Sequence, residues 1–202
     1  KQEAGRMLFI PHDYRTVQAI PYDMPVAGYD CDTVNTLRMW RAKSAKAMDF
    51  ASFSNGDYVK AMQEEELAEV ISKVLYPEDN HYEGKELRLK QHYFFTSATL
   101  QYALKDFKRR FGRNFSLIPE KMTIHINDTH PGLAIPELMR LLIDEEGLGW
   151  DEASAIVQKT VAYTNHTVMS EALERWPEEM VKTLVPRIYM ILKEINRRVC
   201  ER

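Results

Sequence analysis

Two stretches of the sequence place hydrogen-bonding side chains directly after a short apolar segment. Residues 122–126 alternate apolar and polar side chains, which predicts a strand, and a turn-forming run with Asp128 and His130 follows. Residues 160–164 predict a second strand, and Asn165 and His166 follow it. Ligands of open α/β sheets bind beyond the carboxyl ends of the strands. We therefore treat both polar runs as candidate binding residues.

The side chains in these runs suit the recognition of hydroxyl groups. Asp128, His130, Asn165 and His166 can each donate or accept a directional hydrogen bond, and a sugar hydroxyl does both. Each residue also has a structural alternative. Asp128 could cap the following helix, Asn165 could be a turn residue, and a histidine at a strand end could be a structural hydrogen bonder. The pattern leaves these alternatives open, although the joint placement favours a polar, uncharged ligand.

Other chemistries are less well supported by the sequence. His125, Asp128 and His130 have the residue types of a two-histidine, one-carboxylate metal site, but nothing places them on one side of the chain, so we expect no metal. There is no Gly-x-Ser-x-Gly stretch, and neither Cys31 nor Cys200 has a neighbouring histidine in sequence. No glycine-rich loop follows a predicted strand, which argues against a phosphate cradle.

The overall composition limits the partners and the compartment. The net charge of −3 argues against nucleic acid or an anionic membrane as the partner. No apolar run approaches the ~20 residues that span a bilayer. Two cysteines far apart in sequence indicate a reducing compartment, so we expect a cytoplasmic protein. A start without methionine and an end inside a helical pattern suggest a piece of a longer protein.

Three regions differ in their predicted structure. Residues 1–55 predict strands at 16–20 and 33–40, with turns forced by Pro21 and Pro25 and a loop at 43–55. Residues 56–112 predict two long helices, at 57–75 and 85–111, around a polar loop at 77–84. Gly112 is a fitting helix end. The remaining residues, 113–202, predict an α/β portion.

The α/β portion contains the two candidate strands and several helices. A helix is predicted at 133–146, and Asp151 is expected to cap a helix at 152–159. Ser170 is expected to begin a short helix that reaches Arg175. Pro177 opens another helix, and Pro186 interrupts it. The fold class is therefore α/β and helix-rich.

Five motifs resemble the α-glucan phosphorylases, which act on glycogen, starch or maltodextrin. They occur in the order found in that family, and the similarity covers nearly the whole chain. They are IPYDMPV at 20–26, VLYPEDN at 74–80, GKELRLKQ at 84–91, NDTHPGLAIPELMR at 127–140 and YTNHTVMSEALERWP at 163–177. These stretches are long, and hence far more specific than a short consensus.

The resemblance implies an enzyme that uses pyridoxal phosphate. Such an enzyme transfers the terminal α-1,4-linked glucosyl unit of a glucan to inorganic phosphate and releases glucose 1-phosphate. The implied fold has two Rossmann-like domains, of the glycosyltransferase B type, and residues 1–202 would be part of the N-terminal one. The cofactor lysine of the family lies in the other domain, and its Gly-Asn-Met-Lys context is absent from this sequence. We therefore expect this chain alone to be inactive.

The resemblance also assigns roles to individual residues. His166 is similar to the histidine that bonds the 6-hydroxyl of the glucosyl unit, which makes it the candidate catalytic residue. The candidate substrate-binding residues are Asn80 of the loop that gates the site, Asp128 and His130 beside the sugar ring, and Thr167 and Glu174 nearby. The helix at 57–75 resembles the element through which family dimers form.

Two departures from the family pattern change the expectations. His81-Tyr82 stands where animal enzymes carry an aromatic pair after Asn80, so stacking at the gate is in question. Lys105-Asp106 stands where regulated members carry adjacent arginines for a nucleotide phosphate, so we expect no activation by AMP. The alternative to an enzyme is a non-catalytic module on the same scaffold that binds carbohydrate or another subunit.

Overall fold

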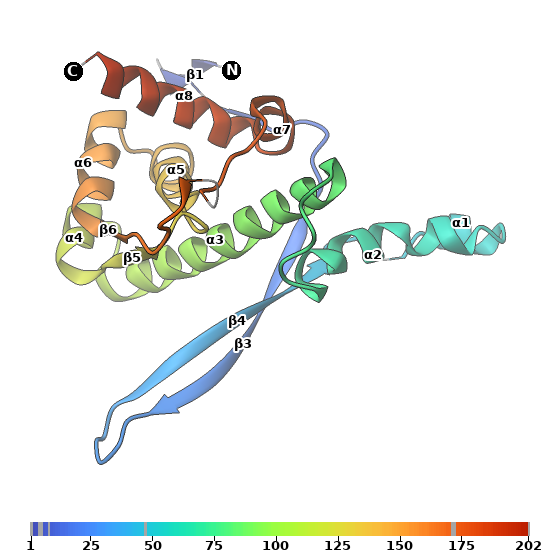
Figure 1. The fold of residues 1–202 in the computed structure, drawn as a ribbon, viewed down its shortest axis with the longest axis horizontal. Helices are drawn as coiled ribbons and strands as arrows, with labels where there is room; N and C mark the ends of the chain where they lie inside the picture. Colours follow the sequence, from blue (N-terminus) through green and yellow to red (C-terminus); the bar gives the residue numbers. More distant parts are fainter. Residues whose placement is uncertain (1, 4–5, 8, 47, 171–172, 202) are drawn as a thin grey trace. The chain divides into compact units, whose positions relative to one another are not determined.

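The computed structural model describes residues 2–3, 6–7, 9–46, 48–170 and 173–201. The chain forms two compact units, each described by itself below. Residues 12–94 make the hairpin unit, and residues 1–11 with 95–202 make the helical unit. The described elements include both strands and helices, and the helices predominate, which confirms a mixed, helix-rich class (Figure 1).

The hairpin unit contains two long strands and three helical segments. They are β3 (Val17–Ala27), β4 (Val34–Ser44), α1 (Phe50–Ser54), α2 (Tyr58–Lys73) and the start of α3 (Tyr82–Phe111). The helical unit contains the short strands β1 (Gln2–Glu3) and β2 (Arg6–Met7), the rest of α3, the 3-10 turn η1 (Phe115–Leu117), α4 (Ile118–Lys121), β5 (Ile124–Asn127), α5 (Ala134–Arg140), the π-helical turn η2 (Leu141–Glu145), α6 (Trp150–Thr160), β6 (Val161–Thr164), α7 (Glu178–Leu184) and α8 (Pro186–Cys200).

Strands β3 and β4 form a long antiparallel hairpin. The register runs from Val17 opposite Ser44 to Ala27 opposite Val34. The prediction that Pro21 ends the first strand was wrong, because β3 continues through Pro21 and Pro25. Proline is tolerated on an edge strand when the missing N–H faces away from the partner, and a spacing of four residues lets both prolines meet this condition.

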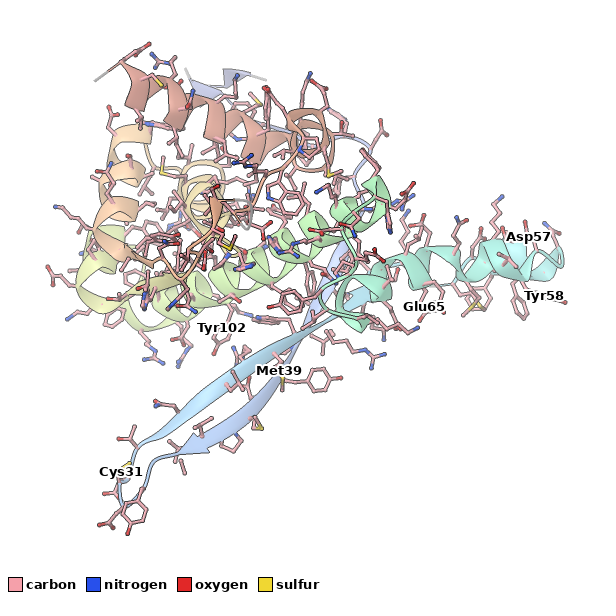
Figure 2. The ribbon with its side chains drawn as sticks, viewed as in Figure 1. Cys31, Met39, Asp57, Tyr58, Glu65 and Tyr102 are labelled. Carbon is pink, nitrogen blue, oxygen red and sulfur yellow. The ribbon has the colours of Figure 1, made fainter. Side chains whose placement is uncertain are left out.

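Charge and apolar surface lie on opposite faces of this hairpin. Asp23 is paired with Arg38, whose Nε and Nη2 donate to its two carboxylate oxygens at 2.6 and 2.5 Å. The other face carries exposed apolar side chains, among them Met39, which Figure 2 shows projecting from β4. The exposed apolar residues of that face are Tyr22, Met24, Val26, Leu37 and Met39.

The loop predicted at 43–55 was only partly correct. β4 extends to Ser44, and α1 occupies Phe50–Ser54 within the region where we expected only strands and loops. Asp49 caps α1, since its Oδ1 accepts from the backbone N of Ala51 and Ser52 at 3.1 Å. The sequence pattern missed this helix because it spans only five residues and its stability depends on the cap.

Helix α2 confirms the prediction for 57–75, beginning at its cap Asp57. It packs on β4, where Ser72 Oγ accepts from Ala42 N at 2.8 Å, and its buried residues are Ala61, Ala68 and Ile71. Other large apolar side chains of α2 are exposed. Val59, with 83% of its surface exposed, is the extreme case.

The loop predicted at 77–84 ends earlier, because α3 already begins at Tyr82. His81 explains the early start: its Nδ1 accepts from Gly84 N at 3.0 Å and so satisfies a free N–H of the first turn. A Cβ at Gly84 would lie 1.8 Å from the Glu78 carbonyl oxygen, so only glycine fits this approach.

The helical unit is built around a parallel pair of strands. β5 and β6 pair in parallel, and α5, η2 and α6 form the connection between them. Parallel strands need such a crossover. Buried apolar side chains of α3, α5, α6 and α8 meet β5 in one core, with Leu138, Leu142 and Ile191 fully buried at its centre.

Two helix predictions in this unit need correction. α6 begins at Trp150 with Gly149 as its N-cap, so Asp151 lies inside the first turn instead of capping it. The Asp151 carboxylate accepts from Arg198 Nη1 of α8 at 2.6 Å. The helix predicted from Ser170 to Arg175 falls partly on residues 171–172, which lie outside the described residues.

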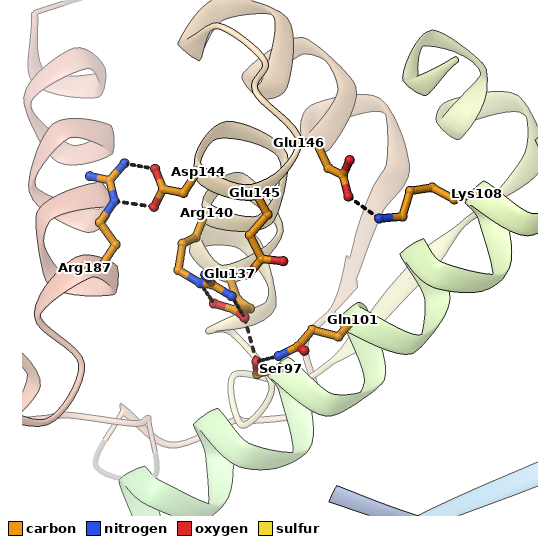
Figure 3. A network of polar contacts seen from close by, with 9 residues as sticks. All are labelled: Ser97, Gln101, Lys108, Glu137, Arg140, Asp144, Glu145, Glu146 and Arg187. Atoms are coloured by element: carbon orange, nitrogen blue, oxygen red, sulfur yellow. Dashed lines mark hydrogen bonds and ion pairs between the residues drawn. The ribbon is translucent and has the colours of Figure 1, made fainter. Parts of the chain in front are cut away.

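A buried carboxylate, Glu137, links α5 to α3 (Figure 3). Its side chain has no exposed surface, and its Oε1 accepts from Ser97 Oγ at 2.6 Å. Arg140 donates to both oxygens of Glu137, at 2.7 and 2.9 Å. Ser97 Oγ in turn accepts from Gln101 at 2.9 Å. The charge is therefore paired and fully hydrogen-bonded, as a buried carboxylate requires.

Acidic residues of the next turn pair with α8, with α3 and with the turn after α3. Asp144 of η2 accepts from Arg187 of α8 at 2.7 Å through both oxygens, and Glu146 pairs with Lys108 of α3 (Figure 3). Glu146 also pairs with Arg113, just after α3, at 2.9 Å. The helix after the candidate site is therefore fixed on several sides.

Replacing Glu137 with alanine should reduce the free energy of unfolding by about 3–5 kcal/mol, because Ser97 and Arg140 would lose a buried acceptor. Chemical denaturation of the protein measures this change. Glu145→Ala is the matched control: that carboxylate also accepts from Arg140, but half of its surface is exposed, so about 1 kcal/mol or less is expected. Equal losses in the two variants would contradict the account.

Candidate functional site

The ends of β5 and β6 lie side by side. Asn127 is paired in register with Thr164, and Asp128 N donates to the Thr164 carbonyl oxygen at 2.8 Å, just past the last register pair. The two polar runs identified in the sequence therefore come together, because parallel strands end at the same sheet edge. Two polar runs that are far apart in sequence thus share one sheet edge.

Asp128 connects the two runs. It is buried, and its φ of 64° lies in the left-handed region, which aspartate tolerates better than most residues. One carboxylate oxygen accepts from Thr129 N at 2.7 Å, and the other accepts from His166 N at 3.2 Å. Thr167 Oγ1 contacts both oxygens, at 2.9 and 2.8 Å. Asp128 thus organises the His166 turn.

These contacts favour the ionised form of Asp128. Hydrogen bonds from Thr129 N and the Thr167 hydroxyl are the largest causes, and together with the His166 N–H and the neighbouring His130 they lower the pKa of the Asp128 carboxyl, against an opposing effect of burial. The alternative role as a helix cap was wrong, since α5 begins at Ala134 with Leu133 as its cap.

His166 is held at both its backbone and its ring. The backbone N donates to Asp128, and Nε2 lies 2.6 Å from Asn127 Oδ1. The residue is exposed to solvent. An imidazole that is anchored at one nitrogen and open on the other side can bind a polar ligand in a defined orientation.

Asn165 and Thr167 form the turn around His166. Asn165 Oδ1 accepts from Thr167 N at 3.2 Å, and Asn165 Nδ2 donates to the Thr167 carbonyl oxygen at 3.0 Å. Asn165 therefore acts as a turn residue, which was the structural alternative for it. The Thr167 hydroxyl donates its hydrogen bond to the Asp128 carboxylate.

Two more predicted residues lie next to each other in the helical unit. His130 Nε2 is 3.6 Å from Glu174 Oε1, which brings the turn after β5 to the segment before α7. His125 is directed to Thr164, with Nε2 and Oγ1 2.5 Å apart. In the described ranges, no group of three His, Cys, Asp or Glu side chains has a metal-binding arrangement.

Asn80 belongs to the hairpin unit, in the loop between α2 and α3. Its Nδ2 donates to Glu78 Oε1 at 2.9 Å. The residues brought together at the strand ends are therefore Asp128, His166 and Thr167, with His130 and Glu174 paired nearby.

Sequence reasoning missed the role of Asn127. No individual role was predicted for this residue at the junction of the strand and the polar turn, yet its side chain holds the His166 ring. The signal that could have revealed it is its position, since the last polar residue of one strand faces the first turn after its parallel neighbour.

None of the helices among the described residues is long and apolar enough to cross a membrane.

A family model for carbohydrate phosphorylases matches residues 1–202. The chain is 51% identical over 197 residues to sheep (Ovis aries) muscle-form glycogen phosphorylase, which covers 94% of the chain and 23% of that relative. It is 52% identical over 193 residues to the mouse (Mus musculus) brain form, a match that covers 92% of the chain and 23% of that relative. The human liver form is 50% identical over 197 residues, covering 94% and 23%. The chain thus spans about a quarter of the length of these relatives.

The stability contributed by Asp128 should depend on pH. A lowered folded-state pKa adds stability above the unfolded pKa of about 3.9, and this stability is lost as the pH falls through the folded value. The difference in unfolding free energy between wild type and Asp128→Asn should therefore be largest near pH 7 and shrink below about pH 4. Asparagine tolerates the left-handed backbone, so the variant tests the charge. A difference that stays constant from pH 7 to pH 3 would contradict this reading.

Proposed function

We propose, from the premise that this chain belongs to the carbohydrate phosphorylase family, that it forms part of the sugar-binding side of an α-1,4-glucan phosphorylase. The complete enzyme transfers the terminal glucosyl unit of the glucan to inorganic phosphate and gives glucose 1-phosphate. The observation that carries the proposal is the convergence of Asp128 and His166 at two parallel strand ends. The names of the relatives, glycogen phosphorylases, support the choice of glucan.

His166 is the residue that we propose contacts the reacting sugar. Its ring is anchored by Asn127 and its backbone by Asp128, so the imidazole can hold one hydroxyl of the glucosyl unit in a fixed position. Such a contact accelerates transfer when it is stronger in the oxocarbenium-like transition state than in the bound substrate. Binding energy away from the reacting bond also orients that bond toward phosphate.

The other site residues have supporting roles. Asp128 holds the turn that carries His166, and Thr167 completes that carboxylate's hydrogen bonds. We propose that His130 and Glu174, which lie 3.6 Å apart, border the sugar pocket. Asn80 is proposed to contact the sugar from the loop before α3, as the resemblance implies.

We propose that the enzyme uses pyridoxal phosphate and that residues outside this sequence hold it. The strand ends do not suit the cofactor's phosphate, because the ionised Asp128 would repel it. The sequence also lacks the family's Gly-Asn-Met-Lys stretch. The residues present therefore serve the sugar, and the chain alone is expected to be inactive.

The wider assembly follows from the same premise. We infer that the chain is part of an N-terminal Rossmann-like domain of the glycosyltransferase B type, which the parallel β5–β6 pair and its helical crossover support.

We also propose that AMP does not activate the enzyme. Asp106 is paired with Arg109 and Arg110, at 2.7 and 2.8 Å, and supplies a negative charge where regulated members bind a nucleotide phosphate. Exposed, unpaired Cys31 and Cys200 support a cytoplasmic location.

We propose that α2 forms a homodimer contact. Large apolar side chains are exposed along it, and Figure 2 shows Asp57 and Tyr58 at its start and Glu65 further along. The exposed apolar residues are Tyr58, Val59, Met62, Leu67 and Val70. Exposed apolar surface of this kind is typical of interaction sites.

Replacing His166 with alanine in the complete, cofactor-loaded enzyme should lower the rate of phosphorolysis by about 100-fold or more, because a contact made in the transition state is lost. Release of glucose 1-phosphate from a maltooligosaccharide measures the rate. His12→Ala, at an exposed position of the hairpin unit, is the control and should retain activity. Near-normal turnover of the His166 variant would refute the assigned role, and a wild-type protein without turnover would favour the non-catalytic module.

Replacing Val59 with aspartate should weaken the proposed dimer at least tenfold, because an ionised side chain would be buried in an apolar contact. Sedimentation velocity over a range of protein concentrations measures the dissociation constant. Gln63→Asp, also exposed and on the same helix, adds the same single negative charge and is the matched control. Unchanged association in Val59→Asp would rule out α2 as the contact.

A further inference from the structure

The contact between Asn127 and His166 has a defined direction. Asn127 Oδ1 lies 2.6 Å from His166 Nε2, within hydrogen-bond distance. An amide oxygen carries no hydrogen and can only accept. Nε2 must therefore carry the proton and donate it to Asn127.

The direction of this bond decides what the other ring nitrogen can do. A neutral imidazole has one N–H, so a proton on Nε2 leaves a lone pair on Nδ1. The only ring hydrogen bond of His166 to another described residue is the one at Nε2. The ring therefore presents at Nδ1 an acceptor that no described residue uses.

We propose that Asn127 is a positioning residue, which fixes the orientation and the tautomer of His166 so that Nδ1 accepts a hydrogen bond from a ligand hydroxyl. The inference rests on the proposed function, and it names the chemical group that the site selects. A hydroxyl can donate to Nδ1, whereas a fluorine or an ionised oxygen at the same place cannot.

The strand geometry explains why Asn127 can perform this task. Asn127 is the last residue of β5 and is in register with Thr164, two residues before His166. Asp128, the next residue, holds the His166 backbone. Two consecutive residues thus have different roles. Asp128 fixes the position of the turn, and Asn127 fixes the rotation of the His166 ring within that turn. A histidine ring that is hydrogen-bonded only to solvent would exchange between its two tautomers and between ring orientations.

The ionisable neighbours of His166 are limited in the described structure. Asp128 contacts its backbone, while His125 and His130 lie on the segments that lead into and out of the Asn127–Asp128 corner. A carboxylate in place of the Asn127 amide would add a negative charge at Nε2. It would favour the imidazolium, which donates at both nitrogens and has no acceptor for a hydroxyl.

The experiment uses the complete, cofactor-loaded enzyme and three variants. Asn127→Leu removes the acceptor at similar size, and Asn127→Asp keeps an acceptor but adds charge. Asn196→Asp makes the same amide-to-carboxylate change on the exposed side of α8 and is the control. Neutron diffraction on deuterated crystals locates the deuteron on the His166 ring, and kcat/KM for a maltooligosaccharide is measured from pH 5.5 to pH 8.5.

The expected results separate positioning from a general loss of structure. Wild type should carry the deuteron on Nε2 alone. Asn127→Leu should lose about 3- to 30-fold in kcat/KM at all pH values, as expected for a lost hydrogen bond. Asn127→Asp should approach wild-type activity at pH 8.5. As the pH falls to 5.5, its kcat/KM should fall about tenfold more than that of wild type, because the added carboxylate favours the imidazolium, which has no acceptor for a hydroxyl. Asn196→Asp should follow the wild-type profile.

Two outcomes would overturn the proposal. One is a deuteron on Nδ1 instead of Nε2, and the other is an Asn127→Asp profile that is parallel to that of wild type. Neither outcome touches the proposed function, which the His166→Ala measurement decides independently. Conversely, full activity of His166→Ala would end the proposed function even if the deuteron lies on Nε2.

Discussion

The candidate site depends on the parallel pairing of β5 with β6. That pairing places the backbone of Asp128 against Thr164, and the Asp128 carboxylate then binds the N–H of His166 and the hydroxyl of Thr167. Without this register, residues almost forty positions apart in sequence would have no reason to meet. A one-residue slip would turn the polar strand residues toward the core and separate the site.

The rest of the helical unit keeps this pair of strands in place. The crossover from β5 to β6 contains α5, whose apolar side carries the fully buried Leu138 and whose polar side is tied to α3 through Glu137. A buried ion pair contributes little net stability when complete, but it penalises every arrangement that breaks it. Glu137 and Asp144 therefore restrict how α5 and η2 can move, and with them the turn that begins at Asp128.

Periodicity predicted the long helices at 57–75 and 85–111 well, because their signals extend over many residues. The two short site strands and the start of α8 at Pro186 were also recognised, from apolar alternation and from the proline. Short-range signals misled where tertiary context decided. Pro21 was interpreted as a strand end although an edge strand accepts it, and Asp151 was assigned as a cap although it binds Arg198. At the site, residue types indicated Asp128 and His166, and the turn role of Asn165 was one of two alternatives, whereas the contact of Asn127 with the His166 ring depends on the direction of its side chain.

The central claim is that the two strand ends together bind one glucosyl unit. A crystal structure of the complete enzyme with a bound maltooligosaccharide tests it most directly. We predict density for the terminal sugar with a hydroxyl about 3 Å from the ring of His166, beside the Asn127–Asp128 corner. An oligosaccharide whose terminal unit is bound in the catalytic cleft, with no sugar atom within hydrogen-bond distance of His166, would contradict the account.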